Sequence, residues 1–390
     1  MSVLFLSLGV TLLYAEFAVA ERQVARGRHD CPPCIFKSTP MLLRENIPLA
    51  PLTTFRLGGP ARFFVEGRTV GEVQEAVAFS NSNNLPLFVL GGGSNLVVAD
   101  SGWPGLVLKV AIPGIERRSG ELDGKALFDV GAGESWDRFV SHAVMAYCAG
   151  VECLSGIPGS VGGTPVQNVG AYGQEVSETI ESVEVLDRKD GQVRELCREA
   201  CGFTYRSSIF NTTERGRFII LRVAYALTPG GAPRIRYADL QRHFEGRETL
   251  PNLAETREAV RHIRALKGML IVDGDPDCRS AGSFFKNPII SREQHEDLQK
   301  RAAAKGLTLP SYPALEKSKK VSAAWLVEHS GFARGYGDSH VGISSKHALA
   351  IVNRGGATAD EVLALKEQIQ QRVEEIWGVQ LEPEPVMVGF

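Results

Sequence analysis

The 390-residue sequence has no excess of charge of either sign. Its 43 lysines and arginines nearly balance 45 acidic residues, which gives a formal net charge of −2 at pH 7. Nucleic-acid grooves and membrane-binding faces usually need a basic surplus, so we expect neither partner. Seven cysteines is an odd number in a long chain, so no disulfide framework is predicted, and a reducing, cytoplasmic setting is favoured. We expect no metal cofactor.

The apolar run Val3–Tyr14 lacks the preceding Lys or Arg of a secretory signal, although Ala18–Ala20 resembles a signal-peptidase site. It is also shorter than the roughly 20 apolar residues of a membrane-spanning helix. Met41 opens a segment typical of the start of a cytosolic protein. We therefore interpret residues 1–40 as a disordered extension or a mis-assigned start. The Cys31–Cys34 pair has redox-motif spacing, but it lies in this stretch, and we assign it no function.

Three nucleotide or catalytic motifs are absent from the sequence. There is no GxxxxGK[ST] string, which disfavours a nucleotide triphosphatase, and no GxGxxG with a following ribose-binding acid, which disfavours a Rossmann domain. GxSxG is missing too, and no histidine is placed by a local signature to act as base for a serine hydrolase. The sequence does have 41 glycines, clustered between Gly91 and Gly173.

Two glycine-rich strings stand out in this region. Glycine tolerates positive φ and has no Cβ, so such loops can turn backbone N–H groups toward an anion. Either string alone could be a simple tight turn, whereas two of them with adjacent Ser or Asn favour a diphosphate site. The expected cofactor-binding residues are Gly91, Gly92, Gly93, Ser94 and Asn95 in the first loop, and Gly156, Ile157, Pro158, Gly159, Ser160 and Gly163 in the second.

Hydrophobic periodicity predicts an α+β protein. We expect helices over 69–83, 135–149, 257–266, 291–305, 323–330 and 359–377, and strands over 87–90, 106–110, 180–186, 218–227 and 348–353. The tail from Gln380 to Phe390 contains two prolines and should be extended. Glu382 and Glu384 lie two apart there, so only one of them could face a cleft.

Outside the glycine loops, the most unusual string is Ser280–Pro288. Gly282 would permit close approach of a ligand to Ser283, and Phe284 and Phe285 could exclude water from the site. The alternative is a capped turn with two core aromatics. Similarly, Arg206 could clamp a carboxylate or form a surface ion pair. Arg264 and Lys267 share a helix face and could hold phosphates or simply be solvated.

With these strings the chain resembles the UDP-N-acetylmuramate dehydrogenase family, also called UDP-N-acetylenolpyruvoylglucosamine reductases. The resemblance runs from about residue 46 to 389 and is to the family's first type. The motifs that carry it are Thr53–Gly59, the first glycine loop, Ile157–Gly173, Tyr205–Ser207, Gly282–Pro288 and Leu381–Glu384, with Arg236–Leu240 and Lys317–Asn353 indicating the first type.

The resemblance implies a vanillyl-alcohol-oxidase-type FAD-binding fold with a C-terminal α+β substrate domain. We expect subdomain 1 over 41–112, joined by the tail 379–390, subdomain 2 over 113–268, and the substrate domain over 269–378. It also implies catalytic roles for Ser283, Arg206 and Glu384, although Pro385–Met387 departs from the family pattern beside Glu384. Tyr237, Arg264, Lys267 and Asn287 are expected at the UDP-sugar.

The implied reaction is NADPH-dependent reduction of UDP-N-acetylenolpyruvoylglucosamine to UDP-N-acetylmuramate, a step of peptidoglycan synthesis, by a monomeric enzyme. Hydride would pass from flavin N5 to C3 of the enolpyruvyl group, and Ser283 would protonate C2. Two alternatives are an oxidase of the same flavin fold and a non-catalytic UDP-sugar or flavin-binding regulator. No histidine occurs between Asp30 and Asp137, which argues against a histidyl-linked flavin near the first loop.

Overall fold

The first glycine loop follows a strand of a mixed four-stranded sheet. The computed structural model describes residues 41–314, 318–337 and 339–390, so the predictions for residues 1–40, including the Cys31–Cys34 pair, lie outside the described residues. The sheet order is β1 (Arg44–Pro48), β2 (Pro60–Gly67), β5 (Trp103–Val110) and β3 (Leu87–Leu90). Both β2 and β3 run parallel to β5.

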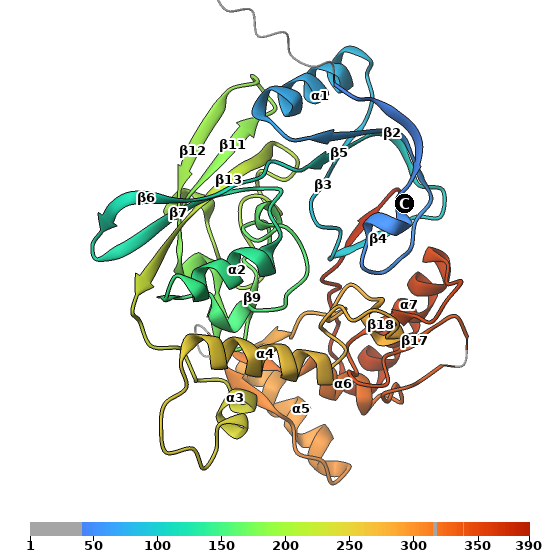
Figure 1. Ribbon diagram of the computed structural model, residues 1–390. Coiled ribbons are helices and arrows are strands. Elements are labelled where there is room, and N and C mark those ends of the chain that lie inside the picture. The colour runs from blue at the N-terminus through green and yellow to red at the C-terminus, as the bar shows by residue number, and fades with distance from the viewer. Residues whose placement is uncertain (1–40, 315–317, 338) are drawn as a thin grey trace, which may run out of the picture. The chain divides into compact units, whose positions relative to one another are not determined.

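Helix α1 (Val70–Ser82) makes the crossover from β2 to β3, as the sequence predicts (Figure 1). The Thr69 side chain accepts a hydrogen bond from the Glu72 N–H and so fixes the start of the helix. Val73, Ala76 and Val77 are the apolar face that packs toward the sheet. This parallel βαβ unit directs β3 straight into Gly91, so the glycine loop leaves the carboxyl end of the strand.

A second, antiparallel sheet follows, with α2 (Trp136–Met145) packed on it. Its strands, in order, are β12 (Val193–Cys197), β11 (Ile180–Asp187), β13 (Phe218–Pro229), β7 (Lys125–Gly131) and β6 (Ile115–Leu122). The helix predicted over 135–149 was too long. Tyr147 has a left-handed φ of 54°, and Cys148–Ala149 form β8, which pairs with the end of β13.

The remaining elements are short strands and helices around the C-terminal half. They are β9 (Gly170–Ala171), β10 (Gln174–Glu175), α3 (Ala238–His243), α4 (Leu253–Leu266), β14 (Ile289–Ile290), α5 (Arg292–Ala304), β15 (Ser311–Pro313), β16 (Lys319–Val321), α6 (Ala323–Glu328), β17 (Val341–Ile343), β18 (Ile351–Asn353) and α7 (Ala359–Trp377). The strand predicted from Ala348 begins only at Ile351. Residues 347–350 form a turn instead, closed by the bond from the Ala350 N–H to the His347 carbonyl.

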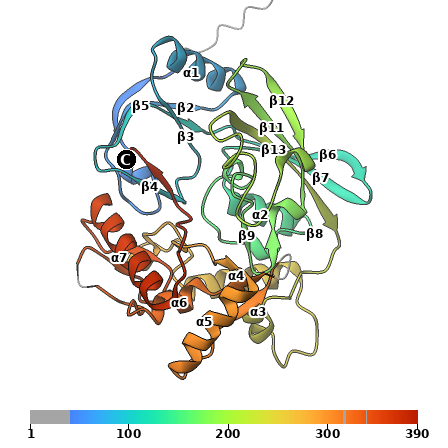
Figure 2. The ribbon, with the colours of Figure 1, turned by 180° about the vertical axis from the view of Figure 1, so that it is seen from behind.

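The C-terminal tail returns to the first glycine loop. Strand β19 (Val386–Val388) pairs in parallel with β4 (Leu96–Val98), and both views show the C-terminus beside β4 (Figures 1 and 2). One hydrophobic core joins Val73 of α1 to Phe139 of α2, and another joins Phe55 to the C-terminal segments. The domain boundaries after residues 112, 268 and 378 stay predictions. None of the helices in the described residues is long and apolar enough to cross a membrane.

Candidate active site

The sequence-predicted site residues gather around one cavity of about 1050 Å³. Its walls come from both glycine loops, the end of α4, the segment around Ser283, and the C-terminal tail. These segments are far apart in the sequence. The pairing of β19 with β4 brings the tail to the first loop, and the second loop follows α2.

The two glycine loops touch each other through their backbones. A Cβ on Gly92 would lie 2.4 Å from the Gly159 Cα, and one on Gly159 would lie 2.9 Å from the Ser94 Oγ. A Cβ on Gly91 would meet the Ser160 Oγ at 2.9 Å. Glycine is therefore required at Gly92 for the close approach of the loops, and at Gly93 and Gly159 for a positive φ.

The cavity wall at these loops fits an anionic, diphosphate-bearing cofactor. The N–H groups of Gly92, Gly93 and Ser94 donate to no backbone carbonyl in the described part of the chain. The Ser160 Oγ is buried and has no partner among the described residues. An unpaired buried hydroxyl is costly, so it marks a place where a ligand would complete the hydrogen bonding. Ile157, Pro158 and Gly163 also line the cavity.

Gly156 is an exception among the residues predicted to bind the cofactor. It does not line the cavity. Its N–H donates to Asp137 Oδ1 at 2.6 Å, and a Cβ there would meet the Leu270 side chain. Asp137 also accepts from Arg257 and Arg261 of α4. Gly156 thus anchors the second loop to α2 and α4, and its N–H is not available to a phosphate.

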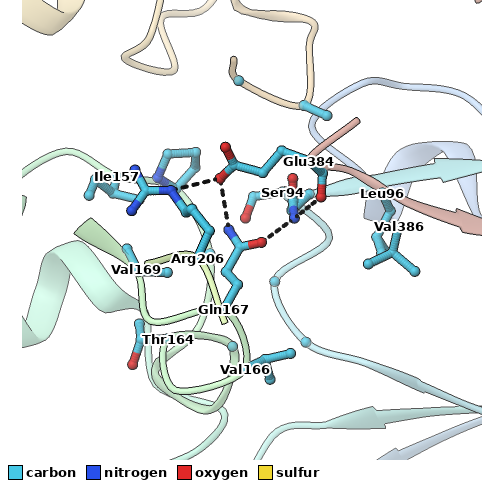
Figure 3. Close-up of a pocket in the computed structure, with 18 of the residues that line it drawn as sticks. Ser94, Leu96, Ile157, Thr164, Val166, Gln167, Val169, Arg206, Glu384 and Val386 are labelled. Carbon is cyan, nitrogen blue, oxygen red and sulfur yellow. Dashed lines mark hydrogen bonds and ion pairs between the residues drawn. The ribbon is translucent and has the colours of Figure 1, made fainter. Parts of the chain in front are cut away.

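The tail places Glu384 inside the cavity and leaves Glu382 outside. The Glu384 side chain is 15% exposed and that of Glu382 is 72% exposed. The Glu384 carboxylate lies 3.2 Å from the Arg206 Nε, and Gln167 Nε2 donates to it at 3.5 Å. Figure 3 shows these three side chains converging. Asn95 connects them to the first loop, since its Nδ2 donates to Gln167 Oε1 at 2.6 Å and to the Glu384 carbonyl at 3.2 Å.

Burial raises the pKa of Glu384, and this effect outweighs the opposing attraction of Arg206 and Lys286. Arg206 itself is held firmly, with a left-handed φ of 55° and a bond from Nη2 to the Gly170 carbonyl at 2.6 Å. A buried acid that keeps its proton to higher pH, beside a fixed guanidinium, can both donate to and attract a bound carboxylate. Gln167 was not singled out from the sequence, because only the fold brings it to Glu384.

Ser283 lies on the same cavity, on a segment fixed by the tail. The Phe284 N–H donates to the Leu349 carbonyl, the Glu384 N–H donates to the Phe284 carbonyl, and Lys286 N–H donates to Glu382. The two aromatics that follow Ser283 do not line the cavity. Phe284 and Phe285 are buried in the C-terminal core, as the alternative interpretation of this string expected for the two aromatics, and they do not themselves face the cavity.

A histidine lies beside Ser283, which sequence reasoning missed. The His347 Nε2 is 3.2 Å from the Ser283 Oγ, although 64 residues separate the two. No local signature could have shown this contact, because it depends on how residues 279–284 pair with the β17–β18 hairpin. Burial, reinforced by Lys267, Arg334 and Arg264, lowers the pKa of His347 to about 4.

The low pKa of His347 predicts a pH-dependent loss of stability. Between pH 6.5 and 4 the unfolded chain binds this proton more readily than the folded one, so the free energy of unfolding falls as pH falls through this range. The contribution amounts to at most about 3 kcal/mol. His347→Gln should remove this part of the pH dependence. Urea unfolding of both proteins between pH 4 and 6.5 measures the effect. If the free energy of unfolding changed equally with pH in the variant and in wild type, the prediction would be contradicted.

The four residues expected at the UDP-sugar all line the cavity. Tyr237 is 44% exposed and packs edge-on against Tyr172 with 5.3 Å between ring centroids. Lys267 pairs with Asp239, and Asn287 Oδ1 accepts from the Ala323 N–H at the start of α6. Arg264 is buried, and its Nε has no partner among the described residues. The solvated-face alternative for Arg264 and Lys267 therefore does not describe Arg264.

Comparison with known proteins agrees with this arrangement. A model of the UDP-N-acetylenolpyruvoylglucosamine reductase C-terminal domain matches residues 275–388, and one of an FAD binding domain matches residues 61–196. The UDP-N-acetylenolpyruvoylglucosamine reductase of Thermobifida fusca (strain YX) is 45% identical over 353 residues, which cover 88% of this chain and 98% of the relative. This chain belongs to the UDP-N-acetylenolpyruvoylglucosamine reductase family.

Two further relatives extend the comparison. The reductase of Streptomyces coelicolor is 45% identical, with 88% of this chain and 90% of the relative covered. The crystal structure of the reductase from Thermus caldophilus matches with a TM-score of 0.60 at 28% identity, and covers 89% of this chain and 99% of that one. Membership of the reductase family confirms the predicted vanillyl-alcohol-oxidase-type FAD fold, and the protein is an FAD-dependent oxidoreductase. The two glycine loops are the residues that would hold FAD.

Proposed function

We propose that this protein uses NADPH to reduce the enolpyruvyl ether of UDP-N-acetylglucosamine to UDP-N-acetylmuramate, a precursor of peptidoglycan. The observation that carries the proposal is that Ser283 and the Arg206–Glu384 pair line the same cavity as the two glycine loops. A proton donor and a carboxylate-binding pair beside a flavin suit the reduction of an enolpyruvyl group. The names of the relatives support this substrate.

Bound FAD would supply the redox chemistry, taking up hydride from NADPH and delivering it to C3 of the enolpyruvyl group. Arg206 binds the substrate carboxylate, and this interaction strengthens as negative charge develops during reduction, which is what accelerates the reaction. Ser283 donates its hydroxyl proton to C2. In its protonated form, which burial favours, Glu384 donates a hydrogen bond to the same carboxylate.

The nucleotide part of the substrate would lie toward the end of α4. Arg264, Lys267, Tyr237 and Asn287 line the cavity, and their side chains offer two cations and two neutral polar groups. Arg264 has an unpaired buried Nε, which a phosphate oxygen would satisfy. Lys267 would exchange its contact with Asp239 for the diphosphate.

A direct test is product analysis with the purified, FAD-loaded protein. With NADPH and the enolpyruvyl nucleotide sugar, the product should gain two hydrogens, one of them from NADPH. An oxidase of the same flavin fold would instead pass electrons to O₂, so peroxide formation in place of sugar reduction would reject the proposal. A protein that binds the sugar but remains colourless and inactive would indicate a regulator.

Glu384→Gln should change the pH dependence of the second half-reaction. The raised pKa means that the protonated form of Glu384 persists above the usual range of a carboxyl, and the rate should fall as pH rises through that pKa. Glutamine keeps a donor but does not titrate, so this alkaline decline should flatten in the variant. Stopped-flow flavin reoxidation across pH measures it. Glu382→Gln, at the exposed neighbour, is the control and should keep the wild-type profile.

A further inference from the structure

The proposed function does not account for the contact between Ser283 and His347. The two side chains line the cavity and lie 3.2 Å apart, Oγ to Nε2. Their backbones are fixed on both sides of this contact. Ser280 forms a bridge with Val352, the Asn353 N–H donates to Arg279, and the Phe284 N–H donates to Leu349. The pair is thus built into the fold.

The hydrogen bond can run in one of two directions, with different consequences. If the imidazole accepted, it would hold the only proton of the Ser283 hydroxyl and turn it away from a substrate. If Nε2–H donates, the Ser283 Oγ accepts and its proton is free to point into the cavity. Burial and the nearby cations Lys267, Arg334 and Arg264 keep His347 neutral, with a single N–H.

The role of Ser283 as proton donor requires donation from Nε2. In the described part of the chain, Ser283 is the one hydrogen-bonding partner of the His347 ring, through Nε2. Nδ1 is not among the buried atoms left without a partner, so water can hydrogen-bond it in either tautomer. Only the Nε2–H tautomer leaves the Ser283 proton free for the substrate. A serine–histidine pair for nucleophilic catalysis needs a third group that orients the base, and no described carboxylate bonds to His347.

We propose that His347 is a positioning residue that donates from Nε2 to the Ser283 Oγ, directs the hydroxyl proton toward C2 of the substrate, and stabilises the alkoxide as it forms. This inference rests on the proposed function, since it assigns Ser283 as proton donor. No proton leaves the imidazole in this role. One fixed donor to a developing oxyanion accelerates a reaction by about 10²–10³-fold.

The test compares His347→Leu, His347→Gln and wild type, all loaded with FAD, by stopped-flow spectroscopy. His347→Leu should leave flavin reduction by NADPH unchanged and slow flavin reoxidation by the enolpyruvyl nucleotide sugar by about 10²-fold. His347→Gln keeps an N–H donor of similar reach and should stay within about tenfold of wild type. His340→Leu, an exposed histidine beside Glu361, is the matched control and should change neither rate.

A double variant separates positioning from a merely structural effect. Ser283→Ala/His347→Leu should be no slower in reoxidation than Ser283→Ala alone, because His347 acts only through its hydrogen bond to the Ser283 hydroxyl, which is already absent. Two results would overturn the inference and leave the proposed function standing. One is slower reoxidation in the double variant than in Ser283→Ala. The other is a His347→Leu reoxidation rate within twofold of wild type while Ser283→Ala is slow. Failure of the wild-type reduced flavin to react with the sugar would instead overturn the proposed function itself.

Discussion

Ser283→Ala is expected to leave flavin reduction by NADPH near the wild-type rate and to slow flavin reoxidation by the enolpyruvyl nucleotide sugar by about 10²–10⁴-fold. The first half-reaction needs hydride transfer and no proton at the sugar, so the hydroxyl does not take part in it. The second needs a proton at C2, and Ser283 lines the cavity as the proposed donor.

The two rates are measured separately by anaerobic stopped-flow absorbance of the flavin. Ser339 does not line the cavity, and among the described residues its hydroxyl bonds to Val341, so it supplies a matched control. Ser339→Ala should therefore match wild type in both steps. Equal slowing of both half-reactions in Ser283→Ala would indicate a structural role for the hydroxyl.

Gly92→Ala is expected to weaken FAD binding by about 10- to 10²-fold, the effect of losing a hydrogen bond to a charged group, so that the purified protein loses most of its yellow colour. The added Cβ would lie 2.4 Å from the Gly159 Cα and 2.6 Å from the Ser160 nitrogen. Both contacts are with backbone atoms, which cannot rotate out of the way. The two loops must therefore separate, and the N–H groups that face the cofactor move with them.

The flavin content of the purified protein and a fluorescence titration of the apoprotein with FAD measure this effect. Gly71→Ala is the control, because that glycine is on the exposed face of α1 and its Cβ would meet nothing closer than 4.0 Å. It should bind FAD as wild type does. A Gly92→Ala protein with full flavin content would mean that the contact between the loops is not needed to hold the cofactor.

Local sequence patterns predicted much of the fold. Apolar periodicity over 69–83 located α1, and the run 359–377 located α7, because an amphipathic face is encoded within a few residues. The helix end at Met145 was mispredicted, because the pairing of Cys148–Ala149 with β13 overrides helical propensity there. Such pairing involves strands distant in sequence, so local patterns do not reveal it.

The sequence indicated individual site residues but not how they are arranged in space. The glycine loops were visible because their chemistry is local, yet the contact of Gly92 with Gly159 was not. Gly156 was assigned to the cofactor from its place in a glycine string, whereas its N–H bonds to Asp137. Gln167 contacts Glu384, which lies 217 residues away in the sequence, and His347 contacts Ser283, which lies 64 residues away. Only the folded chain brings these pairs together.

The visible spectrum of the purified protein tests the central claim most directly. FAD held on the two glycine loops should give an oxidised flavin spectrum, which one equivalent of NADPH bleaches under anaerobic conditions. Addition of UDP-N-acetylenolpyruvoylglucosamine should then restore the oxidised spectrum in full, with formation of an equal amount of UDP-N-acetylmuramate. A reduced flavin that stays bleached in the presence of the sugar and recovers only with O₂ would contradict the account.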